Sequence, residues 1–170
     1  MSQFVAGLIA GAAGTTALNV ASYLDMLIRA RPASSMPAEV AGTLSQKAGI
    51  SLEDGLEQEH AQYRKEGLGA ILGIANGLLI GGAFGLIHSV AGRPPTLISS
   101  IALGALAMAA SDLPATSLGK TDPRSWPASS WIADIVPHLV YGIVTALTLE
   151  AVTNRKSHKS ALQQFAERLR

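Results

Sequence analysis

The 170-residue chain contains no cysteine, and charged residues make up only 15% of it. Without cysteine, disulfide bonds, thiolate metal sites and cysteine nucleophiles are all excluded. Aromatic residues amount to 5% and the net charge is +1, so the chain offers neither a stacking surface for bases nor a basic surface for phosphates, and we expect no nucleic-acid partner. Soluble domains carry about 25% charged residues, and the shortage of charge is the first indication of a membrane protein.

The sequence also lacks the short motifs of common catalytic sites. It contains no H-E-x-x-H, G-x-S-x-G or G-K-[ST] motif, each of which places catalytic or phosphate-binding groups at a fixed spacing. The pair Glu57 and His60 is a lone E-x-x-H, whereas a di-iron bundle needs two such pairs. We therefore expect no cofactor and favour a non-enzymatic protein.

Long uncharged runs take up much of the sequence. Asp, Glu, Lys and Arg are absent from residues 1–24, 67–92 and 94–111. Roughly 17–25 helical residues cross the hydrocarbon core of a bilayer, which is about 30 Å thick, so each run is long enough for a membrane span. A fourth run, residues 131–152, has only two formal charges, both near its ends, and we interpret it as a span too.

These runs predict an all-α polytopic membrane protein with a bundle of four transmembrane helices over residues 1–153. The predicted spans are residues 4–26, 68–90, 96–113 and 131–152. Pro114 is expected to end the third span, because proline disrupts a helix interior. The N-terminal run lacks a basic segment and is too long for a cleaved signal peptide, so we interpret it as the first span.

Polar segments connect and follow the spans. The segment of residues 27–66 predicts two short helices, one after Ser35 and Pro37 and one opened by a capping box at Ser51. The second would lie over the end of the bundle or continue into the second span. The basic segment 154–170 has apolar residues on one face and predicts an amphipathic tail along the membrane surface.

Glycines recur on single faces of the first two predicted spans. The second span carries five of them at intervals of four residues, and the first carries three at intervals of four and three. Because small faces let helix backbones approach closely in a membrane, the glycines predict helix packing within the bundle, in a homo-oligomer or against another membrane protein. The predicted packing residues are Gly69, Gly73, Gly77, Gly81, Gly85, Gly7, Gly11 and Gly14.

Polar residues share one face of the fourth predicted span. Asp134, His138 and Tyr141 are four and three residues apart, and Thr145 and Thr148 continue the stripe. Ionisable groups at membrane depth face a bundle interior or a water-filled cavity. The stripe therefore predicts a polar site inside the bundle.

Chain direction brings further polar residues to the same membrane face, because the first and third spans end where the fourth begins. Pro137 adds a free acceptor there, since it cannot donate a hydrogen bond to the preceding helical turn. The predicted intramembrane cluster consists of Asp25, Asp112, Asp134, His138, Tyr141 and Asn19, with Arg124 and Asp122 as loop partners.

Three interpretations of this cluster stay open. The carboxylates and the imidazole can hold the helices together through hydrogen bonds. They can also form a proton or cation relay, because histidine titrates near neutrality. Carboxylate oxygens with one imidazole can alternatively hold a divalent ion or serve a catalytic site, so the sequence leaves the metal unknown.

The segment TDPRSW and the following WIADIVPHLVYG resemble a family of uncharacterised small bacterial integral-membrane proteins with a T-D-P-R-x-W loop and a D-x-V-P-H-x-x-Y-G helix. The resemblance covers residues 121–142. It implies a multi-pass protein of the bacterial plasma membrane and supplies no activity. The residues that it singles out are Asp122, Arg124, Trp126, Asp134, Pro137, His138 and Tyr141.

These patterns favour one function over two others. The leading hypothesis is a non-enzymatic accessory or assembly subunit of a membrane complex, whose glycine faces pack internally or against a partner. The alternative is a small proton- or cation-linked transporter or channel subunit that uses Asp134 and His138, and a membrane enzyme or metal site comes third. The basic residues on the two sides number seven and six, so the positive-inside rule leaves the orientation undetermined.

Overall fold

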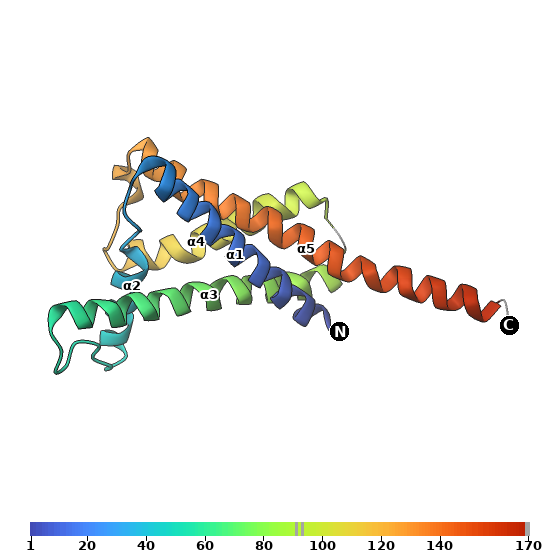
Figure 1. Ribbon diagram of the computed structural model, residues 1–170, viewed down its shortest axis with the longest axis horizontal. Coiled ribbons are helices and arrows are strands. Elements are labelled where there is room, and N and C mark those ends of the chain that lie inside the picture. The colour runs from blue at the N-terminus through green and yellow to red at the C-terminus, as the bar shows by residue number, and fades with distance from the viewer. Residues whose placement is uncertain (91, 93, 169–170) are drawn as a thin grey trace.

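The protein is built from helices packed side by side, as the computed structural model shows (Figure 1). The structure describes the backbone of residues 1–90, 92 and 94–168, and the side chains of residues 1–90, 92 and 94–154. Within this part of the chain there are five α-helices, one short 3-10 helix and no strand. The elements are α1 (Gln3–Arg29), α2 (Met36–Lys47), α3 (Gln58–Val90), α4 (Thr96–Ser117), η1 (Pro123–Ser125) and α5 (Ala128–Arg168).

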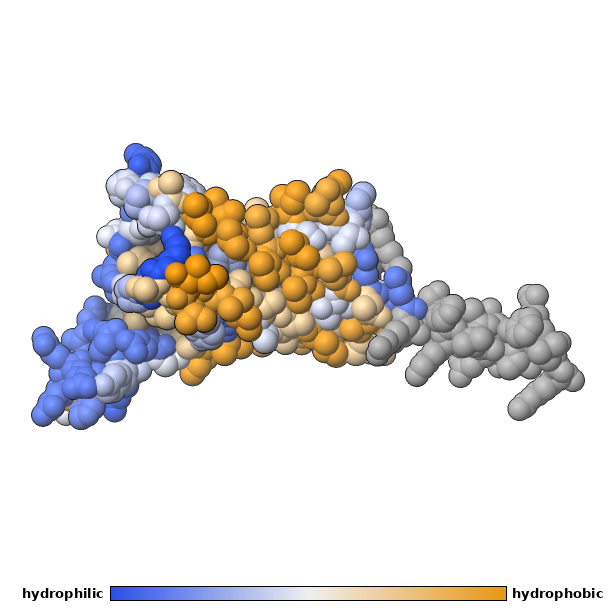
Figure 2. All heavy atoms as spheres, turned by 45° about the horizontal axis from the view of Figure 1, so that its top comes forward, coloured by the Kyte–Doolittle hydropathy of each residue, from blue (hydrophilic) through white to orange (hydrophobic). Residues whose placement is uncertain are grey.

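Four of these helices are long and apolar enough to cross a membrane, namely α1, α3, α4 and the part of α5 from Ala128 to Asn154. The prediction of an all-α protein with four candidate spans is therefore confirmed. Large apolar side chains stay exposed along them, for example Leu97 at 71% and Leu79 at 62%, and Figure 2 shows them as a broad apolar belt. Such a belt is stable in contact with lipid tails, whereas a soluble protein would bury it.

The helices alternate in direction through the bundle. Helix α1 packs on α3 and α5, α4 packs mainly on α5, and α2 packs on α3 with a smaller contact to α4. One end of the bundle, called here the α2 end, holds α2 and η1. The other end, called the N-terminal end, holds the start of α1 and the connection from α3 to α4 (Figure 1).

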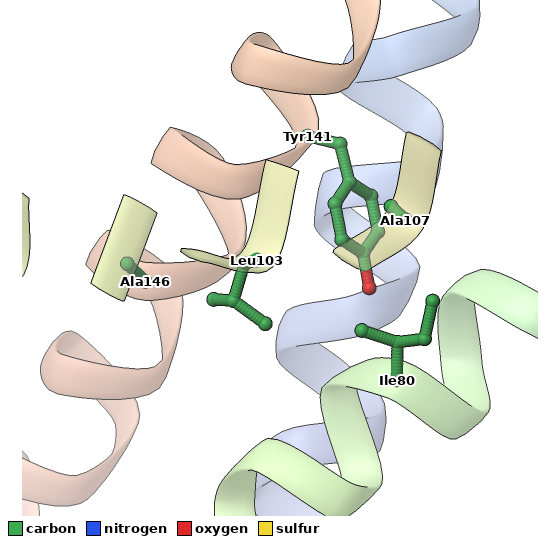
Figure 3. Packing of buried hydrophobic residues seen from close by; sticks show 5 residues of the cluster. All are labelled: Ile80, Leu103, Ala107, Tyr141 and Ala146. Atoms are coloured by element: carbon green, nitrogen blue, oxygen red, sulfur yellow. The ribbon is translucent and has the colours of Figure 1, made fainter. Parts of the chain in front are cut away.

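The centre of the bundle is filled by a few large side chains and many small ones. Tyr141, Leu103, Leu149 and Thr145 are the largest fully buried residues. Tyr141 and Leu103 belong to one cluster with Ile80, drawn in Figure 3, which joins α3, α4 and α5. Leu149 forms a second cluster with alanines of α1. The core is therefore continuous across the four long helices.

Glycines bring α1 and α3 into backbone contact. A methyl group on Gly81 would lie 2.6 Å from the Cα atom of Gly11, and one on Gly7 would lie 2.9 Å from that of Gly82. Real Cβ atoms do not approach other atoms so closely, so alanine at either position would force the helices apart. Gly85 meets the start of α1 in the same way.

The other predicted packing glycines have different surroundings. Gly14 packs on α5, where a methyl group would lie 2.9 Å from the ring of Tyr141, and Gly69 packs on α2 near Pro37. Gly73 has no neighbour within 4 Å of where a Cβ would be, so it makes no helix contact within the bundle, and its packing in a homo-oligomer or against another membrane protein stays a prediction. Helix α1 crosses α3 at an angle (Figure 1), and their contact does not extend to Gly73.

Two predictions about the ends of helices are wrong. Residues 51–57 form a turn instead of the start of the second loop helix, with Gly55 in the left-handed region at φ 71°. The polar helix begins at Gln58 and continues unbroken into the second span as α3, which was one of the two predicted alternatives. Pro114 lies inside α4. Proline lacks an N–H donor but keeps its carbonyl acceptor, and the last turn closes through the N–H of Leu118, which donates to the Pro114 carbonyl at 3.0 Å.

The other two predictions outside the spans have different outcomes. Helix α2 begins directly after Ser35, with Pro37 in its first turn, so the first predicted loop helix is confirmed. Helix α5 continues past the bundle to Arg168 (Figure 1). The amphipathic tail was predicted over residues 154–170, and the side chains of residues 155–170 lie outside the described residues.

Candidate functional site

The core of the candidate site is a pair of residues one turn apart on α5. His138 Nδ1 lies 3.2 Å from Asp134 Oδ1 and 2.8 Å from the backbone carbonyl oxygen of Asp134. The two side chains are 13% and 20% exposed. The spacing of four residues predicted that the two side chains share one helix face. In the structure the imidazole lies against both the carboxylate and the backbone carbonyl oxygen of Asp134.

Asp112 joins this pair from α4, close enough to interact with both Asp134 and His138. Glycines make this approach possible, because a methyl group on Gly104 would lie 2.8 Å from the His138 carbonyl oxygen and one on Gly142 would lie 2.7 Å from the Gly104 nitrogen. The backbones of α4 and α5 are thus nearly in contact. The structure brings together three members of the predicted cluster from two helices.

One oxygen of this cluster lacks a partner. Asp134 Oδ2 is buried and has no hydrogen bond among the described residues. The Asp134 side chain also interacts with a second carboxyl group, that of Asp112, so two acidic groups share one imidazole. Such a trio can hold and exchange protons, because a proton shared between the carboxyl groups relieves their repulsion.

Asp25 does not belong to this group, contrary to the prediction. Its carboxylate pairs with Arg29, with an Nε–Oδ1 distance of 2.6 Å, and with Arg31. Ala30, in the left-handed conformation at φ 47°, ends α1 and turns Arg31 back toward the helix. Arg29 Nη1 also donates to the carbonyl oxygen of Ser129 at 3.1 Å, so this second set of charges ties the end of α1 to the start of α5.

Tyr141 and Asn19 lie apart from the three titratable residues. The hydroxyl of Tyr141 donates to the carbonyl oxygen of Gly77 at 2.7 Å, and the side chain is 1% exposed. Tyr141 is therefore a core residue that joins α5 to α3. Asn19 is half-buried on α1, and among the described residues its side chain has no hydrogen bond that would connect it to the cluster.

The loop residues predicted as partners of the cluster serve the loop itself. Asp122 Oδ1 accepts a hydrogen bond from the N–H of Arg124 at 3.0 Å and caps η1. The side chain of Arg124 is 95% exposed and lies 4.0 Å from Asp122, so its predicted role as a cluster partner is wrong. Trp126 donates to Thr121 Oγ1 at 2.6 Å, and its ring packs against Trp131 with centroids 5.1 Å apart.

The sequence interpretation missed two features of the polar interior. The contact between Gly104 and Gly142 was not predicted as packing, although both glycines lie within apolar runs. At the N-terminal end, Thr96 Oγ1 donates to Glu150 Oε1 at 2.5 Å and joins α4 to α5. A charged residue inside a predicted span is the signal that indicates such a partner.

Chemically, the Asp112, Asp134 and His138 trio offers proton exchange and hydrogen bonding. In the part of the chain that the structure describes, no three His, Cys, Asp or Glu side chains are arranged to hold a metal ion. Comparison with protein-family models, with curated proteins and with solved structures finds no match to the chain. The function must therefore be argued from the geometry.

Proposed function

We propose that this protein is a non-enzymatic accessory or assembly subunit of a membrane complex in the bacterial plasma membrane. The packing at the middle of the bundle carries the proposal. Tyr141, Thr145 and Leu103 are at most 1% exposed, and the Tyr141 hydroxyl already donates to Gly77. A polar path from the cluster toward His88 at the N-terminal end would have to cross this section, which side chains fill.

The charged residues also support a structural role, because they connect different helices. Asp112 meets Asp134 and His138 between α4 and α5, while Asp25 and Arg29 connect α1 to the start of α5. Both sets lie at the α2 end and fix which helices pair. The outward faces are mostly apolar, and another membrane protein can pack on them without disturbing the bundle.

The experiment is purification of the tagged protein from native membranes in mild detergent, followed by identification of the proteins that co-purify. A subunit of a complex should retain a partner in a fixed ratio. Membranes containing the untagged chain, carried through the same steps, provide the control. Recovery of the chain with no partner above this control would contradict the proposal.

A second candidate, proton- or cation-linked transport, is favoured by one specific observation. One buried oxygen of Asp134, Oδ2, has no hydrogen bond among the described residues, and the Asp134 side chain interacts with Asp112. A proton or a small cation bound there would relieve two neighbouring acidic groups. If the cluster acts in this way, Asp134→Asn and His138→Gln should abolish a pH-dependent flux in reconstituted vesicles while the protein stays folded. Asp122→Asn, in the exposed loop, is the matched control. Wild-type vesicles without flux of protons or cations would count against this candidate.

A further inference from the structure

One face of α3 points away from the bundle along the whole length of the membrane. The residues on this face follow one another at intervals of four, three, four, three and four. All but Asn76 are well exposed, and the exposed fraction of the large side chains ranges from 40% for Leu72 to 85% for Val90. These outer residues, called here the α3 seam, are Leu72, Asn76, Leu79, Ala83, Leu86 and Val90. Val90 follows Leu72 by 18 residues, so the seam is about 27 Å long, which matches the hydrocarbon core.

Asn76 is the polar member of the α3 seam. It lies in the middle of the apolar part of α3, is half-buried, and its side chain makes no hydrogen bond among the described residues. A half-buried amide without a partner is costly at this depth, because neither apolar side chains nor lipid tails offer a donor or an acceptor. The side chain therefore needs a partner from outside this chain.

We propose that this partner is Asn76 of a second copy of the chain, so that the protein forms a parallel dimer through the α3 seam. An asparagine carries both an amide donor and a carbonyl acceptor, and two copies can exchange a reciprocal pair of hydrogen bonds. All copies insert in the same orientation, so the two-fold axis of a dimer runs along the membrane normal. On that axis a residue meets its own equivalent at the same depth.

The spacing of the α3 seam supports the same arrangement. Apolar residues at alternating intervals of four and three form the contact of left-handed helix pairs, and a single asparagine within such a contact fixes the register of the pair. Leu72, Leu79 and Leu86 would pack on either side of the Asn76 pair. Ala83 leaves room for the partner helix to approach.

Single cysteines test the dimer in native membranes, because the chain has no cysteine of its own. Asn76→Cys and Leu79→Cys should each give a disulfide-linked dimer under mild oxidation. Ile74→Cys is the control, since Ile74 is 48% exposed at nearly the same depth but two residues away, which places it on the opposite side of the helix. Equal cross-linking at positions 74 and 76, or none at 76 and 79, would overturn the proposal.

A second variant measures the contribution of the amide. Asn76→Leu should raise the dissociation constant of the dimer roughly tenfold, the expected loss for two hydrogen bonds in a membrane, whereas Ile74→Leu should leave it unchanged. At a detergent dilution at which the chain is monomeric, the melting temperature should stay constant in both variants, because the Asn76 side chain makes no hydrogen bond within the described part of its own chain. A wild-type protein that is monomeric in lipid nanodiscs would refute the second copy as the partner, and so would an Asn76→Cys variant that cross-links only to a different protein.

Discussion

At the scale of single residues, Tyr141 shows how a polar group is accommodated in the core of this bundle. It is among the largest fully buried side chains, and its ring packs against Gly14 and Gly77. Its hydroxyl donates to the Gly77 carbonyl oxygen, so the phenol links three helices and leaves no donor unpaired. A polar residue at such a depth stabilises the bundle only while this acceptor is in place.

Tyr141→Phe should therefore lower the free energy of unfolding by about 0.5–1.5 kcal/mol, the typical net value of one hydrogen bond. The ring and its packing remain, so the effect isolates the hydroxyl. Unfolding in mixed detergent micelles, followed by circular dichroism, measures the change. Tyr23→Phe, at a site that is 63% exposed, is the control and should have no effect; a wild-type stability for Tyr141→Phe would mean that the bond does not form in the membrane.

The same scale shows what the sequence could predict of the candidate site. The Asp134 and His138 pair follows from a spacing of four residues on a helix, and the approach of Asp112 follows from chain direction. The separation of Asp25 does not, because it depends on Ala30, whose left-handed conformation turns Arg31 back toward the carboxylate. The conformation of one residue beyond the helix end thus separates Asp25 from the cluster, and a periodic sequence pattern does not predict such a conformation.

At the scale of helices, glycine positions determine which pairs come closest. The interval of four predicted the face of α3, but not how far along α3 the contact with α1 extends. Gly81 lies within it and Gly73 does not, because the crossing angle separates the helices toward the α2 end. Spacing along one helix contains no information about the direction of its neighbour, which is why the five glycines could not be told apart.

Gly81→Ala and Gly73→Ala make a matched pair on the same helix. The first places a methyl group 2.6 Å from the Cα of Gly11 and should destabilise the bundle by about 1–3 kcal/mol through overpacking. The second meets no atom within 4 Å and should be neutral or stabilise by up to about 1 kcal/mol, because alanine favours the helix over glycine. Melting temperatures in detergent compare them, and the opposite order would invalidate the observed contact of α1 with α3.

At the scale of the whole molecule, the exposed apolar belt requires a bilayer as solvent. Hydropathy alone predicted the four spans because uncharged runs of that length have few alternatives. Which helices pack against each other was harder to predict from the sequence. It depends on contacts such as Gly104 with Gly142 that join residues far apart in the sequence.

The protein should stay in the pellet when membranes are washed with alkaline carbonate, and detergent should be needed to extract it. Four spans cannot leave the bilayer without exposing their apolar side chains to water. Fractionation followed by immunodetection of a tag measures this, with a peripheral membrane protein as the control that the wash releases. Recovery of the chain in the supernatant would contradict the four-span fold.

The order in which the helices are synthesised gives the packing a further consequence. Helix α1 packs on α3 and α5, and α4 packs mainly on α5, so the first span enters the membrane well before its partners exist. Until α5 follows, Gly14 and Asp112 have no helix to cover them. A nascent chain that ends before residue 128 would leave this small and acidic surface exposed to the lipid. The last of the four spans thus closes the bundle.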